Sequence, residues 1–167
     1  PLSARPVFRK YLEARDLSDH IVVAPDMGSA KSAARFAKSL NLPIAAGNKE
    51  RLSDTQVKIS GLVGNQVHGH KRALIYDDEI ATGGSIVELL DRLADEGCTS
   101  AAVACTHGLF VGKAVDRLRQ HPMISEVVTT DTVPAPGGWP ELRVRTVAGL
   151  FAQAIARVHA GESVSSL

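Results

Sequence analysis

Residues 77–85 combine acidic and small side chains in an order that suits the binding of a phosphorylated ligand. A run of apolar residues, Leu74-Ile75-Tyr76, leads directly into the adjacent carboxylates of Asp77 and Asp78. Four small residues then follow, Thr82-Gly83-Gly84-Ser85, and they open a segment with helical periodicity. Backbone N–H groups at the start of a helix can surround a phosphate, here together with two hydroxyls. Glycines let the backbone approach such an anion closely.

The two carboxylates would repel a phosphate unless they bind something else. Two acceptors at a fixed spacing suit the vicinal hydroxyls of a ribose, which are donors. A Mg²⁺ ion that bridges ligand oxygens and a carboxylate would also relieve the repulsion. The segment is not a P-loop, because no lysine follows the glycines, and its acids precede the glycines, unlike a dinucleotide-binding fingerprint. An acidic turn followed by a Gly/Ser helix cap is the alternative interpretation.

Strand-like and helix-like segments alternate along the 167 residues, of which 44% are hydrophobic. Strands are predicted at residues 21–24, 43–46, about 57–63, 73–76, 101–105, 126–129 and 142–147. Helices are predicted at about 7–16, 29–40, 84–96, 113–120 and 148–160. This alternation predicts an α/β fold with a mostly parallel sheet and helices on both faces. Ligands bind such sheets beyond the carboxyl ends of the strands, which is where residues 77–85 fall.

Two further expectations concern one loop and the last helix. Residues 47–56 are polar, charged and without a period, so they are predicted to form an exposed loop. The last helix is expected to turn its apolar residues inward, namely Leu150, Phe151, Ala154, Ile155 and Val158.

Charge and composition exclude several classes of function. Because 19 basic residues offset 18 acidic ones, no global field would attract nucleic acid or a membrane surface. No apolar run approaches the roughly 20 residues that span a bilayer, and the start lacks a signal-peptide pattern. Cys98 and Cys105 have no metal-binding spacing, so buried reduced thiols and a cytoplasmic location are expected. The chain starts at Pro1, which suggests a longer natural protein.

Residues 76–85 resemble the ribose-phosphate loop of type I phosphoribosyltransferases. Other motifs narrow the resemblance to the phosphoribosyl pyrophosphate synthetase family, also called ribose-phosphate pyrophosphokinases. The segment Val22-Val23-Ala24-Pro25-Asp26-Met27-Gly28 resembles one of its motifs, and Asn48-Lys49-Glu50-Arg51 resembles its catalytic loop. Residues 104–110, 130–134 and 159–167 are similar to other segments of that family. The resemblance runs from Pro1 to Leu167.

This resemblance implies an activity and a site. The family transfers the β,γ-diphosphate of ATP to the 1-hydroxyl of ribose 5-phosphate, which gives phosphoribosyl pyrophosphate and AMP. By the family pattern, Asp77 and Asp78 hold the ribose diol, and Ala81-Thr82-Gly83-Gly84-Ser85 hold the 5-phosphate. Lys49 and Arg51 are implied as catalytic residues on a mobile loop that closes over the phosphates. Asp26 is implied as part of the Mg²⁺ environment.

The chain also departs from the family pattern. Ala81 stands where an acid is usual, and Glu50 replaces an arginine of the catalytic loop. The family is a tandem of two similar α/β domains, and residues 1–167 resemble only the second. The chain is therefore expected to be a single phosphoribosyltransferase-type domain that lacks the ATP site and is inactive alone. The resemblance also implies a homo-oligomer.

Two other functions remain open. One is a nucleobase phosphoribosyltransferase that consumes phosphoribosyl pyrophosphate, although one Trp, two Tyr and four Phe leave little for a base-gripping hood. The other is a non-catalytic regulatory subunit of a synthetase, which the departures at Ala81 and Glu50 keep open.

Overall fold

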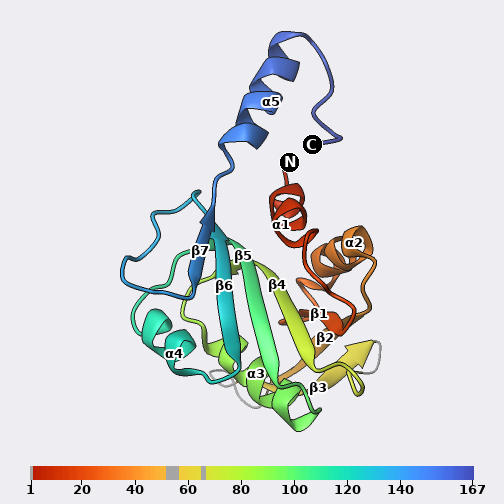
Figure 1. Cartoon of the computed structure of the whole chain (residues 1–167), viewed down its shortest axis with the longest axis vertical. Helices are drawn as coiled ribbons and strands as arrows, with labels where there is room; N and C mark the ends of the chain where they lie inside the picture. Colours follow the sequence, from red (N-terminus) through yellow and green to blue (C-terminus); the bar gives the residue numbers. More distant parts are fainter. Residues whose placement is uncertain (1, 52–56, 65–66) are drawn as a thin grey trace.

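A twisted β-sheet forms the centre of the molecule (Figure 1). The computed structural model describes residues 2–51, 57–64 and 67–167. Over these residues the strand order is β3-β2-β1-β4-β5-β6-β7, and all neighbours are parallel except β2 and β3. The strands are β1 (His20–Ala24), β2 (Ile44–Arg51), β3 (Val57–Gly64), β4 (Arg72–Ile80), β5 (Ser100–Gly108), β6 (Ile124–Thr130) and β7 (Leu142–Arg145).

Helices cover both faces of the sheet. The helices are α1 (Arg5–Leu12), α2 (Ala30–Leu40), α3 (Gly84–Asp95), α4 (Ala114–Gln120) and α5 (Ala148–His159), and the first four of them pack on the sheet. Alternate residues of each central strand enter two separate cores: Leu74 packs in the core with α1 and α2, and Ile75 in the core with α3 and α4. Burial on both faces explains why these strands read as continuous apolar runs. The predicted fold class is confirmed, and no helix of the described residues is long and apolar enough to cross a membrane.

The predicted exposed loop at residues 47–56 is wrong for its first half. Residues 47–51 continue β2 and pair antiparallel with β3, up to the pair Arg51 and Val57. Backbone hydrogen bonds hold this hairpin, so it needs no alternation of apolar and polar side chains. Residues 52–56 lie outside the described residues. β4 is likewise longer than predicted, because it continues past Tyr76 to Ile80.

Helix α5 does not bury its apolar stripe as predicted. It projects beyond β7, away from the body of the sheet (Figure 1), and leaves Phe151 49%, Ile155 68% and Val158 67% exposed. Within the helix only Ala154 is buried. An apolar stripe indicates that a helix face is suited to burial, but it does not say which surface covers it.

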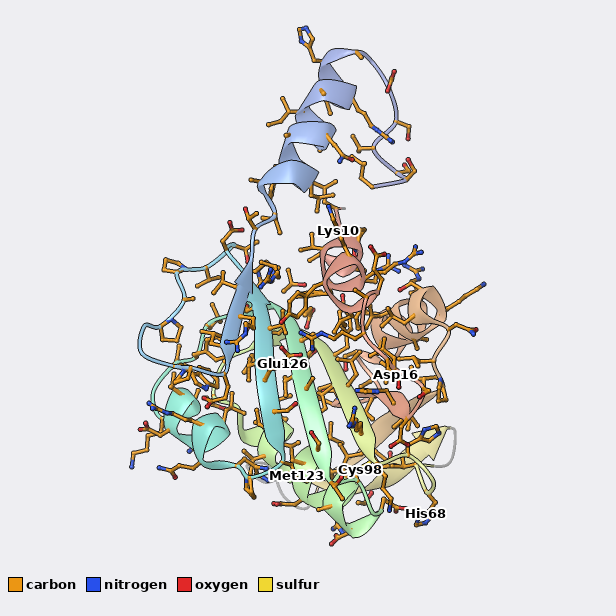
Figure 2. All side chains as sticks on the ribbon, viewed as in Figure 1. Lys10, Asp16, His68, Cys98, Met123 and Glu126 are labelled. Carbon is orange, nitrogen blue, oxygen red and sulfur yellow. The ribbon has the colours of Figure 1, made fainter. Side chains whose placement is uncertain are left out.

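The two cysteines are buried, as the sequence analysis predicted. Cys98 and Cys105 are buried free thiols, and burial raises the pKa of Cys105 to about 12. In Figure 2, Cys98 and Met123 mark the lower end of the drawn sheet, where β5 and β6 begin. The carboxyl ends of these strands therefore lie at the opposite end.

A buried acid on β6 holds the segment at α1 against the sheet. Glu126, labelled in Figure 2, accepts a hydrogen bond of 2.9 Å from the Tyr11 hydroxyl and pairs with the guanidinium of Arg15. Two guanidinium groups also lie over the Tyr11 ring, with Arg15 4.4 Å and Arg145 4.3 Å from its centroid. Such contacts compensate the free-energy cost of burying the Glu126 carboxylate. This cost would be large if the carboxylate had no partner.

We expect Tyr11→Phe to lower the free energy of unfolding by about 1 kcal/mol, because it removes one hydrogen bond to a carboxylate and keeps the ring. In a Glu126→Ala background the same change should cost much less. Chemical denaturation of the four chains measures this coupling. An equal cost of Tyr11→Phe in both backgrounds would show that the hydroxyl does not act through Glu126.

Candidate functional site

A cavity of about 230 Å³ opens where β4 ends and α3 begins. It is lined by residues 79–86 together with Asp26 and Asp77. Asp26 follows β1, which pairs with β4, so two neighbouring strands deliver these residues to the carboxyl edge of the sheet. Larger cavities of about 840 and 570 Å³ lie elsewhere, beside α1 and α5 and at the opposite edge of the sheet. The smaller cavity is the one that contains the predicted loop.

The backbone carbonyls of this loop are held on the side away from its amides. The Ile80 carbonyl accepts from the N–H groups of Leu109 and Phe110 at 3.0 and 3.1 Å. The Ala81 carbonyl accepts from the N–H of Val111 at 2.9 Å. In a trans peptide the carbonyl and the following N–H point in opposite directions. These bonds therefore turn the amides of the next residues away from the 109–111 segment.

Arg117 continues this series from α4. Its guanidinium donates a hydrogen bond of 3.1 Å to the carbonyl of Thr82. Over the described residues, none of the N–H groups of residues 82–85 donates a hydrogen bond to a protein acceptor. Four amides at the N-terminus of a twelve-residue helix are thus available to an anion.

Gly83 has to be a glycine at the turn into α3. Its φ is +73°, in the left-handed region that other residues adopt at a cost. A Cβ at this position would lie 3.2 Å from Cγ of Leu118, a fully buried side chain of α4. The turn and its close packing on α4 therefore explain the glycine.

The acidic side of the cavity carries a destabilised charge. The pKa of the Asp77 carboxyl is raised to about 7, mainly by burial and in smaller part by the neighbouring carboxylates of Asp78 and Asp26. A hydrogen bond of 2.9 Å from the N–H of Asp78 to Asp77 Oδ1 opposes the rise. Asp78 itself is exposed and is not among the residues that line the cavity. The Asp77 carboxylate is therefore suited to a partner that donates protons or carries positive charge.

Asp26 is anchored in its own turn as well as facing the cavity. Its Oδ1 accepts the N–H of Ser29 at 3.0 Å, and the Ser29 hydroxyl donates to the Asp26 main-chain carbonyl at 3.1 Å. Ser29 immediately precedes α2, and its hydroxyl does not cap that helix. Strand β2 passes close by, since a Cβ on Gly47 would lie 2.5 Å from the Pro25 carbonyl oxygen.

The structure brings most of the predicted residues to one edge of the sheet. Asp26, Asp77 and residues 81–85 line a single cavity. Lys49 and Arg51 belong to the end of β2, whose Ala46 pairs with Ala24 of β1, two residues before Asp26. Their backbones thus extend β2 beyond its pairing with β1, on the side of the sheet where Asp26 lies, while their side chains lie outside the described part of the structure.

The sequence interpretation missed two residues. Glu79 lines the cavity, although only Asp77 and Asp78 were singled out from the acidic run. Arg117 contacts the loop from a helix surface where isolated arginines are common, and no motif marks it. Only the three-dimensional placement of α4 against the loop identifies it.

Replacing Asp77 by asparagine should stabilise the protein at neutral and alkaline pH. The folded carboxyl keeps its proton up to about pH 7, whereas the unfolded chain loses it near pH 3.8. Between these values the folded state binds more protons, so the free energy of unfolding falls as pH rises. Allowing for solvent screening, Asp77→Asn should gain about 1 kcal/mol, or about 2–4 °C in Tm, at pH 8.

The gain should vanish near pH 4, where the folded carboxyl is protonated in any case. Thermal unfolding across this pH range, without added metal, checks the prediction. The matched control is Asp95→Asn, an exposed acid at the far end of α3. A gain for Asp77→Asn that is equal at pH 4 and pH 8 would argue against a raised pKa.

Comparisons with known proteins identify the family to which the chain belongs. A profile of the phosphoribosyl synthetase-associated domain matches residues 55–167. A putative ribose-phosphate pyrophosphokinase of Streptomyces coelicolor is 46% identical over 162 residues, which is 96% of this chain and 49% of the relative. The ribose-phosphate pyrophosphokinase of Caldanaerobacter subterraneus is 41% identical over 97% of this chain and 51% of its own length. The chain thus spans about half the length of these curated relatives.

Solved structures share the fold of this chain. The phosphoribosylpyrophosphate synthetase of Mycobacterium smegmatis matches 95% of this chain and 51% of its own, with a TM-score of 0.81 and 30% identity. The adenine phosphoribosyltransferase of Giardia lamblia shares the fold over 72% of this chain and 74% of its own, with a TM-score of 0.58 and 16% identity. The predicted type I phosphoribosyltransferase fold is confirmed. By fold, profile and sequence identity, the chain belongs to the phosphoribosyl synthetase-associated domain family.

Proposed function

We propose that this chain is the ribose 5-phosphate-binding and catalytic-loop domain of a ribose-phosphate diphosphokinase. The reaction would transfer the diphosphate of ATP to the 1-hydroxyl of ribose 5-phosphate and give phosphoribosyl pyrophosphate and AMP. One observation carries the proposal: the unpaired amides of residues 82–85 and the carboxylate of Asp77 meet in one cavity. The naming of the curated relatives as pyrophosphokinases supports it.

The site would hold the two ends of the sugar phosphate differently. The amides of residues 82–85 would bind the 5-phosphate at the positive end of α3, with the hydroxyls of Thr82 and Ser85 as further donors. Asp77 and Asp78 would accept hydrogen bonds from the ribose 2- and 3-hydroxyls. Ala81 offers its backbone only, because it lacks the acid that is usual at this position.

Lys49 and Arg51 are proposed as the catalytic residues. Their backbones continue β2 beyond its pairing with β1, next to the turn that carries Asp26. In phosphoryl transfer, negative charge spreads over the equatorial oxygens of the moving group, and nearby cations stabilise it. A hairpin arm that closes over the phosphates would bring these cations to the reaction and exclude water.

Mg²⁺ is the proposed cofactor, and the donor set fits it. Asp26, Asp77 and Glu79 line the cavity, and no cationic side chain is among the described residues that do so. No group of three or more histidine, cysteine or acidic side chains in the described structure could hold a metal alone. Mg²⁺ usually takes one or two carboxylates and completes its shell with phosphate oxygens and water. Asp26 would hold it, with Asp77 nearby, and the ion would neutralise charge on the diphosphate.

The ATP site is proposed to lie outside residues 1–167. The relatives are about twice as long as this chain, and the described cavity accounts for a sugar phosphate but not for a nucleotide. We therefore propose that the chain is equivalent to the C-terminal domain of a two-domain synthetase and works as part of a homo-oligomer in the cytoplasm. Alone, it should release no AMP from ATP and ribose 5-phosphate.

A regulatory subunit of a synthetase is the second candidate. Ala81 in the loop and Glu50 in the β2 extension favour it, because both alter the family pattern at charged positions. Such a subunit would bind the sugar phosphate but would not contribute Lys49 and Arg51 to the reaction. The nucleobase phosphoribosyltransferase alternative has less support, because the curated relatives compared above are named pyrophosphokinases.

Calorimetric titration should detect saturable binding of ribose 5-phosphate to this chain in the presence of Mg²⁺. The double variant Asp77→Asn/Asp78→Asn should weaken binding by at least about tenfold, because it removes charged acceptors for the diol. The matched control is Asp91→Asn/Asp95→Asn, which removes two exposed charges near the opposite end of α3. An equal loss of affinity in both variants would contradict the role of the acidic pair.

The catalytic assignment requires the active enzyme that contains this domain. In that enzyme, Lys49→Ala/Arg51→Ala should lower kcat by about a hundredfold or more. The reason is that the two cations would no longer stabilise the negative charge on the transferring group in the transition state. The KM for ribose 5-phosphate should change little. Removal of two exposed cations of α2, in Arg35→Ala/Lys38→Ala, is the control. Unchanged kcat in the first variant would reject the catalytic role and favour the regulatory subunit.

A further inference from the structure

Helix α4 forms the outer wall of the phosphate-binding loop, defined here as residues 81–85. Leu118 packs behind Gly83, where a Cβ would lie 3.2 Å from Cγ of Leu118 and would fit only if that side chain shifted. One residue earlier, the Arg117 guanidinium donates a hydrogen bond of 3.1 Å to the Thr82 carbonyl. α4 thus contacts the loop at two consecutive residues.

The Arg117 bond differs in kind from the other bonds that hold the loop. Backbone N–H groups hold the carbonyls of Ile80, Ala81 and Gly83, with Val87 donating to Gly83 at 3.1 Å. The Thr82 carbonyl is held by a side chain, and no described backbone N–H donates to it. Because the peptide unit is planar and trans, the direction of this carbonyl also sets the direction of the Gly83 N–H. One exposed arginine is therefore bonded to the peptide unit that carries an amide in the centre of the loop.

The charge of the guanidinium matters as well as its geometry. The described residues that line the cavity include three acids, Asp26, Asp77 and Glu79, and no cation. A phosphate that enters the cavity therefore meets a negative wall. Arg117 places a positive charge directly behind Thr82, one of the lining residues. Salt would screen the attraction between the Arg117 guanidinium and a phosphate beside Thr82 only in part, since the Debye length is about 8 Å at physiological ionic strength.

We propose that Arg117 is a positioning residue for the 5-phosphate: it fixes the Thr82–Gly83 peptide unit so that the Gly83 N–H faces the bound phosphate. It does so through the loop and does not itself contact the ligand. This inference rests on the proposed function, because it assigns Arg117 to the same ribose 5-phosphate site.

The test is calorimetric titration of the chain with ribose 5-phosphate, inorganic phosphate and ribose. Arg117→Met keeps the aliphatic stem and removes the donor. It should weaken the binding of ribose 5-phosphate and of inorganic phosphate by a similar factor, about three- to tenfold. Any binding of ribose should not change. Arg117→Lys, which retains a charged donor, should recover most of the loss, and a purely structural role of the stem would give no such recovery.

Arg119→Met is the matched control, because Arg119 is exposed on the same helix and its loss changes the net charge equally. It should alter affinity by less than about twofold at physiological ionic strength. An equal loss in the Arg119 and Arg117 variants would overturn the inference in favour of a net-charge effect. Thermal unfolding of each variant checks that it folds, and Arg117→Ala serves as a second removal variant.

The inference and the proposed function can fail separately. If Arg117→Met binds ribose 5-phosphate as tightly as the unsubstituted chain, while Asp77→Asn/Asp78→Asn does not bind it, only the role of Arg117 is overturned. If the unsubstituted chain does not bind ribose 5-phosphate, the proposed function is overturned for this chain, and the role of Arg117 with it.

Discussion

The direction of the peptide units between Ile80 and Gly83 is the constraint on which the candidate site depends. Their carbonyls bond to residues 109–111 and to Arg117, so the amides that follow are turned to the other side. The parallel sheet makes this possible, because β5 pairs with β4 along its whole length and ends beside it. The segment that follows β5 therefore lies behind the loop that follows β4. The fold in this way supplies hydrogen-bond donors behind a loop made of small residues.

The same edge of the sheet concentrates negative charge, and this gives the site its chemical character. Asp77 is held where burial raises the pKa of its carboxyl to about 7, beside Asp26 and Asp78. An arrangement of this kind costs stability in the ligand-free protein. A ligand with hydroxyl donors, or a cation, would recover that cost on binding. The free amides at one end of the cavity and the carboxylates at the other are therefore suited to one ligand that carries both a phosphate and hydroxyls.

The sequence predicted the parts of this arrangement that depend on local patterns. Buried parallel strands such as residues 73–76 read as apolar runs, and the acids and glycines of residues 77–85 form a recognisable order. The extension of β2 to Arg51 was not predicted, because backbone pairing holds it without an apolar pattern. The exposure of Phe151 on α5 was missed because a helix pattern does not identify the covering surface. Arg117 was missed because its role depends on where α4 packs.

Amide chemical shifts of the chain during titration with ribose 5-phosphate are the most direct test of phosphate binding by residues 82–85. The amides of these residues should shift most, and ribose without its phosphate should leave them unchanged. Such a result would place the phosphate at the N-terminus of α3. Shifts confined to residues around the larger cavity beside α1 and α5, with the loop amides unaffected, would contradict it.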